Sequence, residues 1–401
     1  MQSHGVRAEA GHRLMVLDDC FPHPLSSFRF AELSGLLDAF PSATVHTSLA
    51  AMPFLGMQKA PSDLIESHLR MFPQDQDRIQ LLHEGTSFAG QAAYCVFFQN
   101  VRTYLDALNR SCTPFAFTLY PGGSFYLNEP AVDEGLKRIF DSPNFRCVIA
   151  TQKITRDYLI EKGLCDEERI RLIYGGVMPP PALSDLPEKQ FFGIHKKTVD
   201  VCFAGWKYMP LGRDKGFDTF IHAARILAKR FEFVQFHVIG PWDEQEIDVS
   251  DLAGRIHFHA PLSSPDLRKF FRGIDLFLSP NRVFTLMPGK FDAFPLGCCV
   301  EAALSGVAVC ATDELNQNIS FTHGRDVLIC GVEAEEVANM AGEAIANYDG
   351  LCELAAAGLS KFSEVFGWEA QMAPRLEVLS RLLSLPAPPP VPPPRRVPPL
   401  P

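Results

Sequence analysis

Short apolar runs alternate with longer amphipathic stretches along most of this 401-residue chain. Short apolar runs are typical of buried parallel strands, and apolar residues three and four positions apart are typical of helices. Strands are predicted at 14–17, 115–119, 146–150, 171–174, 199–204, 234–239, 256–259, 276–279 and 307–310. Helices are predicted at 28–40, 136–140, 155–162, 217–230, 266–272, 297–305 and 368–383, with one or two more within 84–108. This alternation indicates an α/β protein.

A proline-rich connector interrupts the alternation, which then starts again. We therefore predict two domains: an N-terminal Rossmann-like domain (1–176) and, after a linker (177–196), a C-terminal domain (197–365). Two terminal segments follow, a helix that returns to the N-terminal domain (366–385) and a disordered tail (386–401). Pro374 should kink the last helix or mark the first turn of its main segment. The tail has ten prolines in sixteen residues, cannot build a core, and could bind a protein partner weakly.

Charge and cysteine content narrow the class of protein. The net charge of −10 argues against binding to nucleic acid. The 11 cysteines lack paired spacing, which is typical of a reduced compartment without disulfide bonds. His257 and His259 share one face of a predicted strand, but no third ligand follows at matching spacing, so no metal site is expected. We find no signal peptide and no transmembrane segment, so we expect a cytoplasmic protein, with peripheral association at the inner membrane face left open.

The segment from Phe291 to Gly306 carries the most chemical information. Asp292 lies in a predicted turn and Glu301 in the first turns of a predicted helix, with a Pro-Leu-Gly loop between them. A helix start offers unpaired N–H groups and a positive dipole end to a phosphate, and a carboxylate can accept hydrogen bonds from a ribose diol. Phosphate and diol together indicate a nucleotide. An ordinary capped helix start explains this segment alone about equally well.

Four motifs occur in order along the second half. They are Phe203-Ala-Gly205 with Lys207, Lys215-Gly-Phe-Asp218, Val238-Ile-Gly240, and Phe291-Asp-Ala-Phe-Pro with Glu301-Ala-Ala. This ordered set resembles the nucleotide-binding half of glycosyltransferase family 4, the glycosyl transferases group 1 proteins. The first half resembles only a subset of that family, through residues 117–125. The resemblance implies the GT-B fold, in which two Rossmann-like domains face each other across a cleft.

The resemblance also implies a reaction and its residues. A retaining, hexosyltransferase-like enzyme would move a sugar from a nucleotide-diphosphate sugar to an acceptor hydroxyl, in glycan or glycoconjugate biosynthesis. Lys215 and Lys207 would neutralise the leaving diphosphate without a metal ion or another cofactor, and Asp292 would bind sugar hydroxyls. The implied donor site comprises Glu301 for the ribose, with Phe294, Pro295, Leu296, Gly297, Gly205 and Gly240. The implied acceptor side, in the N-terminal domain, comprises Tyr120, Gly122, Gly123 and Arg29, with Asn100 and Tyr104.

Two departures from the family pattern keep an alternative open. Eight residues separate Asp292 from Glu301, where the family usually has seven, and Tyr120 stands where many members have histidine. Both changes would also suit a non-catalytic protein that binds sugar nucleotides and acts as a scaffold. An epimerase or phosphorylase with the same fold would need an acid/base group or a lysine-bound cofactor, for which we find no motif.

Overall fold

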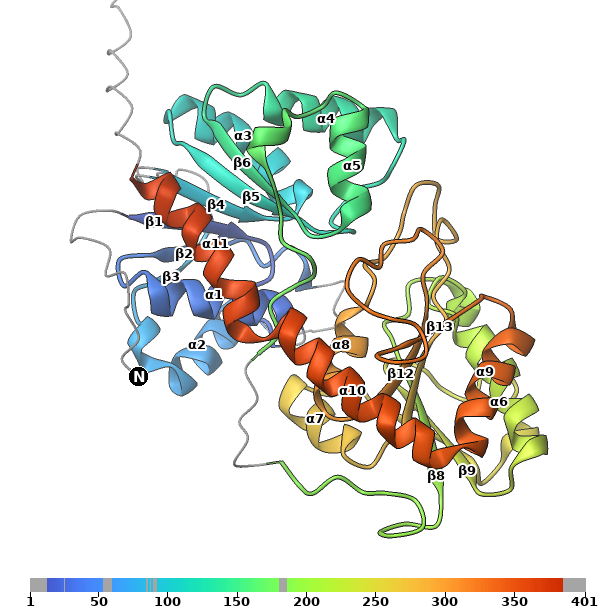
Figure 1. Cartoon of the computed structure of the whole chain (residues 1–401). Coiled ribbons are helices and arrows are strands. Elements are labelled where there is room, and N and C mark those ends of the chain that lie inside the picture. Colours follow the sequence, from blue (N-terminus) through green and yellow to red (C-terminus); the bar gives the residue numbers. More distant parts are fainter. Residues whose placement is uncertain are drawn as a thin grey trace, which may run out of the picture.

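The structure is a computed structural model (Figure 1). It describes residues 13–384 apart from Leu25, 53–59, 84–85, 87, 89–91 and 180–185. The predicted proline-rich tail, 386–401, and the middle of the predicted linker lie outside the described residues. Two parallel α/β sheets confirm the predicted fold class of two Rossmann-like domains. The exact domain boundaries stay predictions.

The N-terminal sheet contains, within the described residues, seven parallel strands in the order β3-β2-β1-β4-β5-β6-β7. The strands are β1 (Leu14–Asp18), β2 (Thr44–Thr47), β3 (Ile79–Leu81), β4 (Ala92–Val96), β5 (Phe115–Leu119), β6 (Phe145–Ala150) and β7 (Ile170–Leu172). The helices of this half are α1 (Ser27–Ala39), α2 (Pro61–Met71), α3 (Phe98–Arg110), α4 (Pro130–Phe140) and α5 (Lys153–Glu161). β1, β4 and β5 are buried throughout, as expected for apolar strands covered by helices on both faces.

One prediction in this half is wrong. The described part of 84–108 is not purely helical, because 92–96 forms the central strand β4 and helix α3 starts only at Phe98. A short apolar run cannot be assigned to strand or helix by periodicity alone, and here it directly precedes an amphipathic helix. Phe97, with a φ of 73°, separates the two elements.

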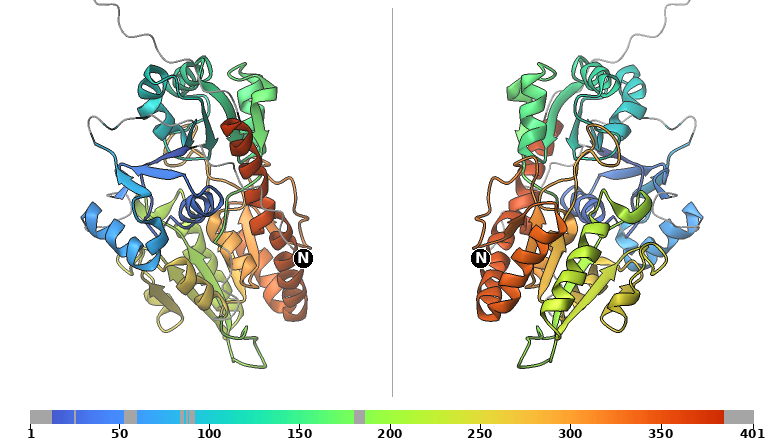
Figure 2. Two further views of the ribbon diagram at one scale, coloured as in Figure 1. Left: turned by 90° about the vertical axis from the view of Figure 1, so that its left-hand side faces the viewer. Right: turned by 90° about the vertical axis from the view of Figure 1, so that its right-hand side faces the viewer.

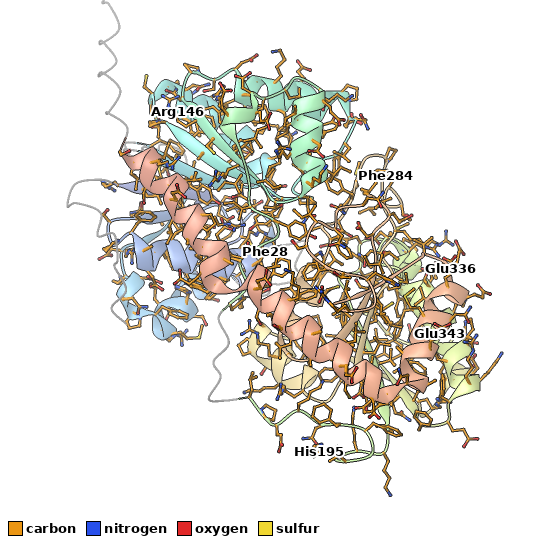
Figure 3. All side chains as sticks on the ribbon, viewed as in Figure 1. Phe28, Arg146, His195, Phe284, Glu336 and Glu343 are labelled. Atoms are coloured by element: carbon orange, nitrogen blue, oxygen red, sulfur yellow. The ribbon has the colours of Figure 1, made fainter. Side chains whose placement is uncertain are left out.

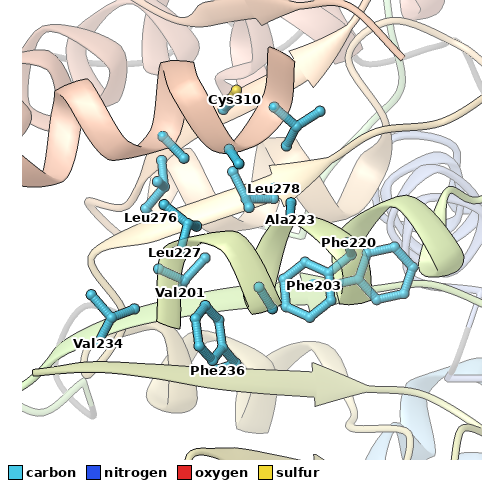
Figure 4. Close-up of a cluster of buried hydrophobic side chains, with 14 of the residues drawn as sticks. Val201, Phe203, Phe220, Ala223, Leu227, Val234, Phe236, Leu276, Leu278 and Cys310 are labelled. Atoms are coloured by element: carbon cyan, nitrogen blue, oxygen red, sulfur yellow. The ribbon is translucent and has the colours of Figure 1, made fainter. Parts of the chain in front are cut away.

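The C-terminal sheet contains, in the described part of the chain, six parallel strands in the order β10-β9-β8-β11-β12-β13. The strands are β8 (Val199–Ala204), β9 (Val234–Ile239), β10 (Ile256–His259), β11 (Leu276–Ser279), β12 (Ala308–Thr312) and β13 (Leu328–Cys330). The helices are α6 (Phe217–Arg230), α7 (Ser264–Phe271), α8 (Gly297–Leu304), α9 (Ala334–Ala346) and α10 (Tyr348–Phe366). Aromatic side chains such as Phe203, Phe220 and Phe236 fill the space between α6 and the sheet (Figure 4).

Helix α11 (Trp368–Leu383) continues from α10 after Gly367 and runs along the N-terminal domain (Figures 1 and 2). Met372, Leu379 and Leu382 belong to the N-terminal hydrophobic core. Pro374 lies inside the helix rather than in its first turn, so of the two predicted alternatives only the kink remains a prediction. None of the described helices is long and apolar enough to cross a bilayer.

The carboxyl-terminal edges of the two sheets are in contact. The N–H of Leu127 donates to the carbonyl of Gly289 at 2.9 Å, and the Phe125 and Phe291 rings lie 5.9 Å apart. Phe28, at the junction of the domains in Figure 3, packs against both hydrophobic cores. The two halves therefore form one contiguous body.

Candidate functional site

The topology of the C-terminal sheet predicts where a ligand binds. β8 and β11 are neighbours, but the chain leaves them toward opposite edges of the sheet, β8 toward β9 and β11 toward β12. In open α/β sheets, ligands bind at such a switch point, beyond the carboxyl ends of the strands. The loop 205–216 follows β8, and the loop 280–296 follows β11 and leads into α8.

A buried ion pair joins these two loops. The ammonium of Lys215 lies 2.6 Å from Oδ2 of Asp292, and Nδ2 of Asn281 donates to the same oxygen at 3.0 Å. The side chains of Lys215 and Asp292 are 11% and 28% exposed. Gly216 brings the loops close: its φ is 70°, and a Cβ there would lie 1.9 Å from the carbonyl oxygen of Pro280. The structure thus joins two residues that the sequence predicted separately.

The pair holds both of its charges. Burial is the largest single effect and would lower the pKa of Lys215, but the charge and hydrogen bond of Asp292, together with the charges of Tyr208 and Asp214, raise it. Burial alone would raise the pKa of Asp292, but the charge and hydrogen bond of Lys215, with the hydrogen bond of Asn281, lower it. A fixed ammonium therefore lies at the switch point.

Two further residues, Tyr208 and Lys290, complete this cluster, and sequence reasoning missed both. Tyr208 is 48% exposed, and the ammonium groups of Lys215 and Lys290 lie 5.3 and 5.0 Å from its ring centroid. Burial raises the pKa of Tyr208, while the positive charges of Lys215 and of Arg29 in the N-terminal domain oppose this effect. Nothing in residue type or spacing separates Lys290 from other loop lysines except its position two residues before Asp292.

Glu301 lies in α8 and is 3% exposed. Its Oε1 accepts a hydrogen bond from the Ser264 hydroxyl at 2.8 Å. Burial raises the pKa of Glu301, against the lowering effects of Ser264, of the charge of Arg268 and of hydrogen bonding to Ser27. Ser27 opens α1 of the N-terminal domain, so Glu301 lies where the two domains meet.

The start of α8 is accessible. Phe294 and Pro295 are buried, whereas Gly297, the first residue of the helix, is exposed. The N-cap residue, Leu296, offers no side-chain hydrogen bond to the first N–H groups of this helix. The four predicted donor-site residues 294–297 thus bring a helix start, with backbone donors, to the same side of the sheet as Lys215.

The structure places Lys207 differently from Lys215. Lys207 is exposed and forms an ion pair with Glu246, whose other carboxylate oxygen accepts from the N–H of Leu211 at 2.6 Å. Gly205 and Gly240 lie beside this loop. The Gly205 carbonyl accepts a hydrogen bond from the Trp242 indole at 2.8 Å, and the N–H of Gly240 donates to the backbone carbonyl of His259 at 3.0 Å.

Two of the predicted acceptor-side residues lie at the switch point of the N-terminal sheet. Arg29 contacts Oδ1 of Asp19 at 2.5 Å and Oδ2 of Asp18 at 3.5 Å. Asn100 donates to the carbonyl of Val96 at 2.7 Å and to Asp19 at 3.4 Å. These side chains follow β1 and β4, which are neighbours from which the chain again leaves in opposite directions.

The other predicted acceptor residues lie around the loop after β5. The hydroxyl of Tyr120 donates to Oε2 of Glu32 at 2.7 Å. The same hydroxyl accepts a hydrogen bond from Arg375 of α11 at 3.3 Å. Tyr120 is 6% exposed, so its hydroxyl belongs to a buried network. Gly122 and Gly123 form the following turn, where the Gly123 carbonyl accepts from Gln99 at 3.2 Å. Tyr104 is half-buried, and its ring lies 6.0 Å from the ring of Phe88 with a tilt of 42°.

The histidines on β10 pack with a third on β9. The rings of His257 and His259 lie 5.2 and 5.4 Å from the ring of His237, whose Nε2 is 2.8 Å from Asp200. Among the residues that the structure describes, no group of three or more His, Cys, Asp or Glu side chains is arranged to hold a metal ion.

Comparisons with known proteins agree with the resemblance seen in the sequence. Residues 199–347 match the family model described as "Glycosyl transferases group 1". No curated protein sequence matches the chain.

Solved structures match nearly the whole chain. HepE from Anabaena, solved with UDP and glucose, is 16% identical, with a TM-score of 0.65 over 92% of this chain and 100% of that one. A glycosyltransferase from Rickettsia africae is 12% identical, with a TM-score of 0.66 over 94% and 99%. Sucrose-phosphate synthase from Thermosynechococcus elongatus is 13% identical, with a TM-score of 0.60 over 93% and 100%. The C-terminal domain therefore matches the glycosyl transferases group 1 family, and the whole chain has the GT-B fold.

Proposed function

We propose that this protein is a glycosyltransferase that moves a sugar from a nucleotide-diphosphate donor to an acceptor hydroxyl. The observation that carries the proposal is the buried Lys215–Asp292 pair, which lies at the switch point of the family-matched domain. A fixed ammonium at this place suits a reaction in which a diphosphate leaves with its charge.

The donor fits the C-terminal domain along the line from Lys215 to Glu301. The diphosphate would bind the uncapped start of α8 and the ammonium of Lys215. The ribose diol would donate to the carboxylate of Glu301, which the interface of the two domains shields from water. A UDP-sugar is the first donor class to test, because HepE was also solved with UDP-glucose.

Asp292 would orient the sugar. In the described part of the chain, the hydrogen bonds of Lys215 and Asn281 both reach its Oδ2, which leaves Oδ1 to accept from a sugar hydroxyl. The acceptor would approach from the N-terminal domain, on the side of Arg29, Asn100 and the loop after Tyr120. We further propose that the product is a glycan or glycoconjugate.

We propose transfer with retention of the anomeric configuration. The bond from the anomeric carbon to the phosphate oxygen breaks, and its electron pair stays on the phosphate, where Lys215 stabilises the charge. The acceptor oxygen bonds to the same face of the anomeric carbon, and its proton moves to the departing phosphate oxygen. This route needs no protein nucleophile.

A thermal-shift screen tests the donor site. We expect one class among UDP-, GDP-, ADP- and dTDP-sugars to raise the melting temperature, since a ligand at 100 times its Kd adds about 2.7 kcal/mol. Glu301→Gln should abolish that shift, whereas Glu246→Gln, at an acid that pairs with Lys207, serves as the matched control and should keep it.

The same screen separates the alternatives. If no sugar nucleotide shifts the wild-type protein, the proposed function is wrong. If a donor binds but neither hydrolysis nor transfer follows with any acceptor, the protein is the non-catalytic scaffold instead. The released sugar, analysed by NMR for its anomeric configuration, decides between retention and inversion.

A further inference from the structure

We propose that Lys290 supplies a second cation to the leaving diphosphate, and that the N-terminal domain holds this lysine in place. This inference deepens the proposed function and rests on it. Its test below is chosen so that the two can fail separately.

The first step is that Lys207, one of the two lysines that the sequence predicted for the diphosphate, is already paired with a carboxylate. Lys207 pairs with Glu246, which also caps the N–H of Leu211 in the same loop. Lys290 forms no ion pair within the described residues. Its ammonium instead lies over the Tyr208 ring, which Lys215 also contacts. Lys290 therefore brings a positive charge to the side chain that borders the Lys215–Asp292 pair, and the carboxylates of Asp292 and Asp214 act on it without a direct ion pair.

The second step is the charge balance of the cluster. Lys215 and Asp292 neutralise each other, so on their own they leave little net field for a diphosphate. Lys290 adds a second ammonium that offsets the charge of buried Asp214, a carboxylate that acts on both lysines. Burial, and next the charge of Lys215, lower the pKa of Lys290, so its ammonium is held at a cost that a bound anion would relieve. A cluster of this kind gains most when a doubly charged group arrives beside it.

The third step is that the neighbours of Lys290 belong to the contact between the domains. The carbonyl of Gly289 accepts from Leu127 at 2.9 Å, and a Cβ at Gly289 would lie 2.1 Å from the Leu127 carbonyl oxygen. On the other side, Phe291 is 2% exposed and inserts into the N-terminal core beside Phe125.

The backbone on both sides of Lys290 is thus fixed by the acceptor domain. Separating the two domains would remove these contacts of Gly289 and Phe291 and loosen Lys290, although its N–H and carbonyl stay bonded to Met287 and Phe284 in the same loop. The geometry therefore links full stabilisation of the leaving group to contact between the domains, so that cleavage of the donor without an acceptor is disfavoured. Lys290 acts by charge alone and keeps its proton throughout.

The test compares Lys290→Met with Lys229→Met in the full chain. Lys229 is an exposed lysine near the end of α6, at the other edge of the sheet, and is the charge-matched control. We expect Lys290→Met to weaken binding of the nucleoside diphosphate about tenfold by titration calorimetry, and to lower kcat by about tenfold or more, because it removes one electrostatic donor. Lys290→Arg should keep most of both and move the alkaline limb of the pH profile to higher pH.

A second variant tests the role of the N-terminal domain. Phe125→Leu should lower kcat several-fold in the wild-type background and cause no further loss in the Lys290→Met background, because both changes remove the same interaction. Additive losses would show that Phe125 has only a structural role and would overturn the positioning by the N-terminal domain.

The remaining outcomes are distinct. If the wild type binds and uses a donor but Lys290→Met matches Lys229→Met, this inference is wrong and the proposed function stands. If the wild type binds no nucleoside diphosphate, the proposed function fails, and the inference fails with it.

Discussion

The two sheets end in switch points of the same topology but with different chemistry. In the N-terminal sheet, Arg29 bridges the carboxylates of Asp18 and Asp19. Asn100 also donates to Asp19, and the N–H groups of Cys20 and Phe21 donate to Asp18 at 2.7 Å. This cluster carries one net negative charge, and its acceptors are already used.

The C-terminal switch point contains two lysines, with Asp214 as a second carboxylate beside Asp292. Lys215 is paired with Asp292, and Lys290 adds a positive charge without an ion pair among the described residues. The C-terminal switch point therefore offers two ammonium groups to an anionic donor, whereas the acceptors of the N-terminal cluster are already used within the protein. Local charge, rather than topology, distinguishes the roles of the two domains.

The largest expected effect comes from removing the fixed cation, Lys215, of the C-terminal switch point. Lys215→Met should lower kcat by about 10²–10³, because a preorganised donor to the developing charge is lost. It should also lower the melting temperature, because Asp292 loses its partner. In the double variant Lys215→Met/Asp292→Asn, the melting temperature should recover while kcat stays low. A single variant with kcat within twofold of the wild type would contradict this assignment.

A change at the N-terminal switch point should affect the stability of the protein instead of its activity. Arg29→Met leaves two buried carboxylates without their cation, so we expect a loss of about 3 kcal/mol in the free energy of unfolding, measured by urea titration. Affinity for the donor should change by less than about twofold, since the donor binds the other domain. Adding Asp19→Asn should restore part of the stability. A large loss of donor affinity in folded Arg29→Met would show that the two switch points are not separate in function.

The smallest expected effect is a pH dependence at Glu301. Burial raises the pKa of this carboxyl above its ordinary value of 4.5. Since the ionised carboxylate accepts from the ribose, donor affinity should fall as the pH drops through this raised pKa. The free energy of unfolding should change in the opposite sense, decreasing as the pH rises from 4.5 through the raised pKa, because the folded protein binds more protons than the unfolded chain there.

Calorimetric titrations of the wild type at several pH values measure the change in donor affinity. Urea titrations over the same pH range, with Glu301→Gln as the reference, measure the change in the free energy of unfolding, and the variant should lack that slope. A slope of equal size in Glu301→Gln would assign the titration to another group.

The central strands of both sheets could be predicted from the sequence because apolar runs as distinct as 115–119 and 199–204 stand between amphipathic helices. The edge strands β7 and β10 could be predicted as well, whereas the edge strands β3 and β13 could not. β3 and β13 have only three residues each, and their burial is mixed, which leaves no apolar pattern to detect. β4 was assigned to a helix because its apolar run directly precedes α3.

The site was predictable as separate parts rather than as an arrangement. Lys215, Asp292 and Glu301 belong to motifs, and residue type alone suggested their chemistry. The pairing of Lys215 with Asp292 depends on how two distant loops meet, as does the capture of Lys207 by Glu246. Lys290 carries no motif, and its importance emerges only from the contacts of Gly289 and Phe291 with the other domain.

Helix α11 has a consequence for how this protein is made. The N-terminal core contains side chains from the last helix, and fully buried Arg375 lies 3.7 Å from Glu32. The first half of the chain leaves the ribosome long before this helix is synthesised. Until then its interior lacks one wall and Glu32 lacks a counter-charge, so the domain that is translated first is the last to be completed.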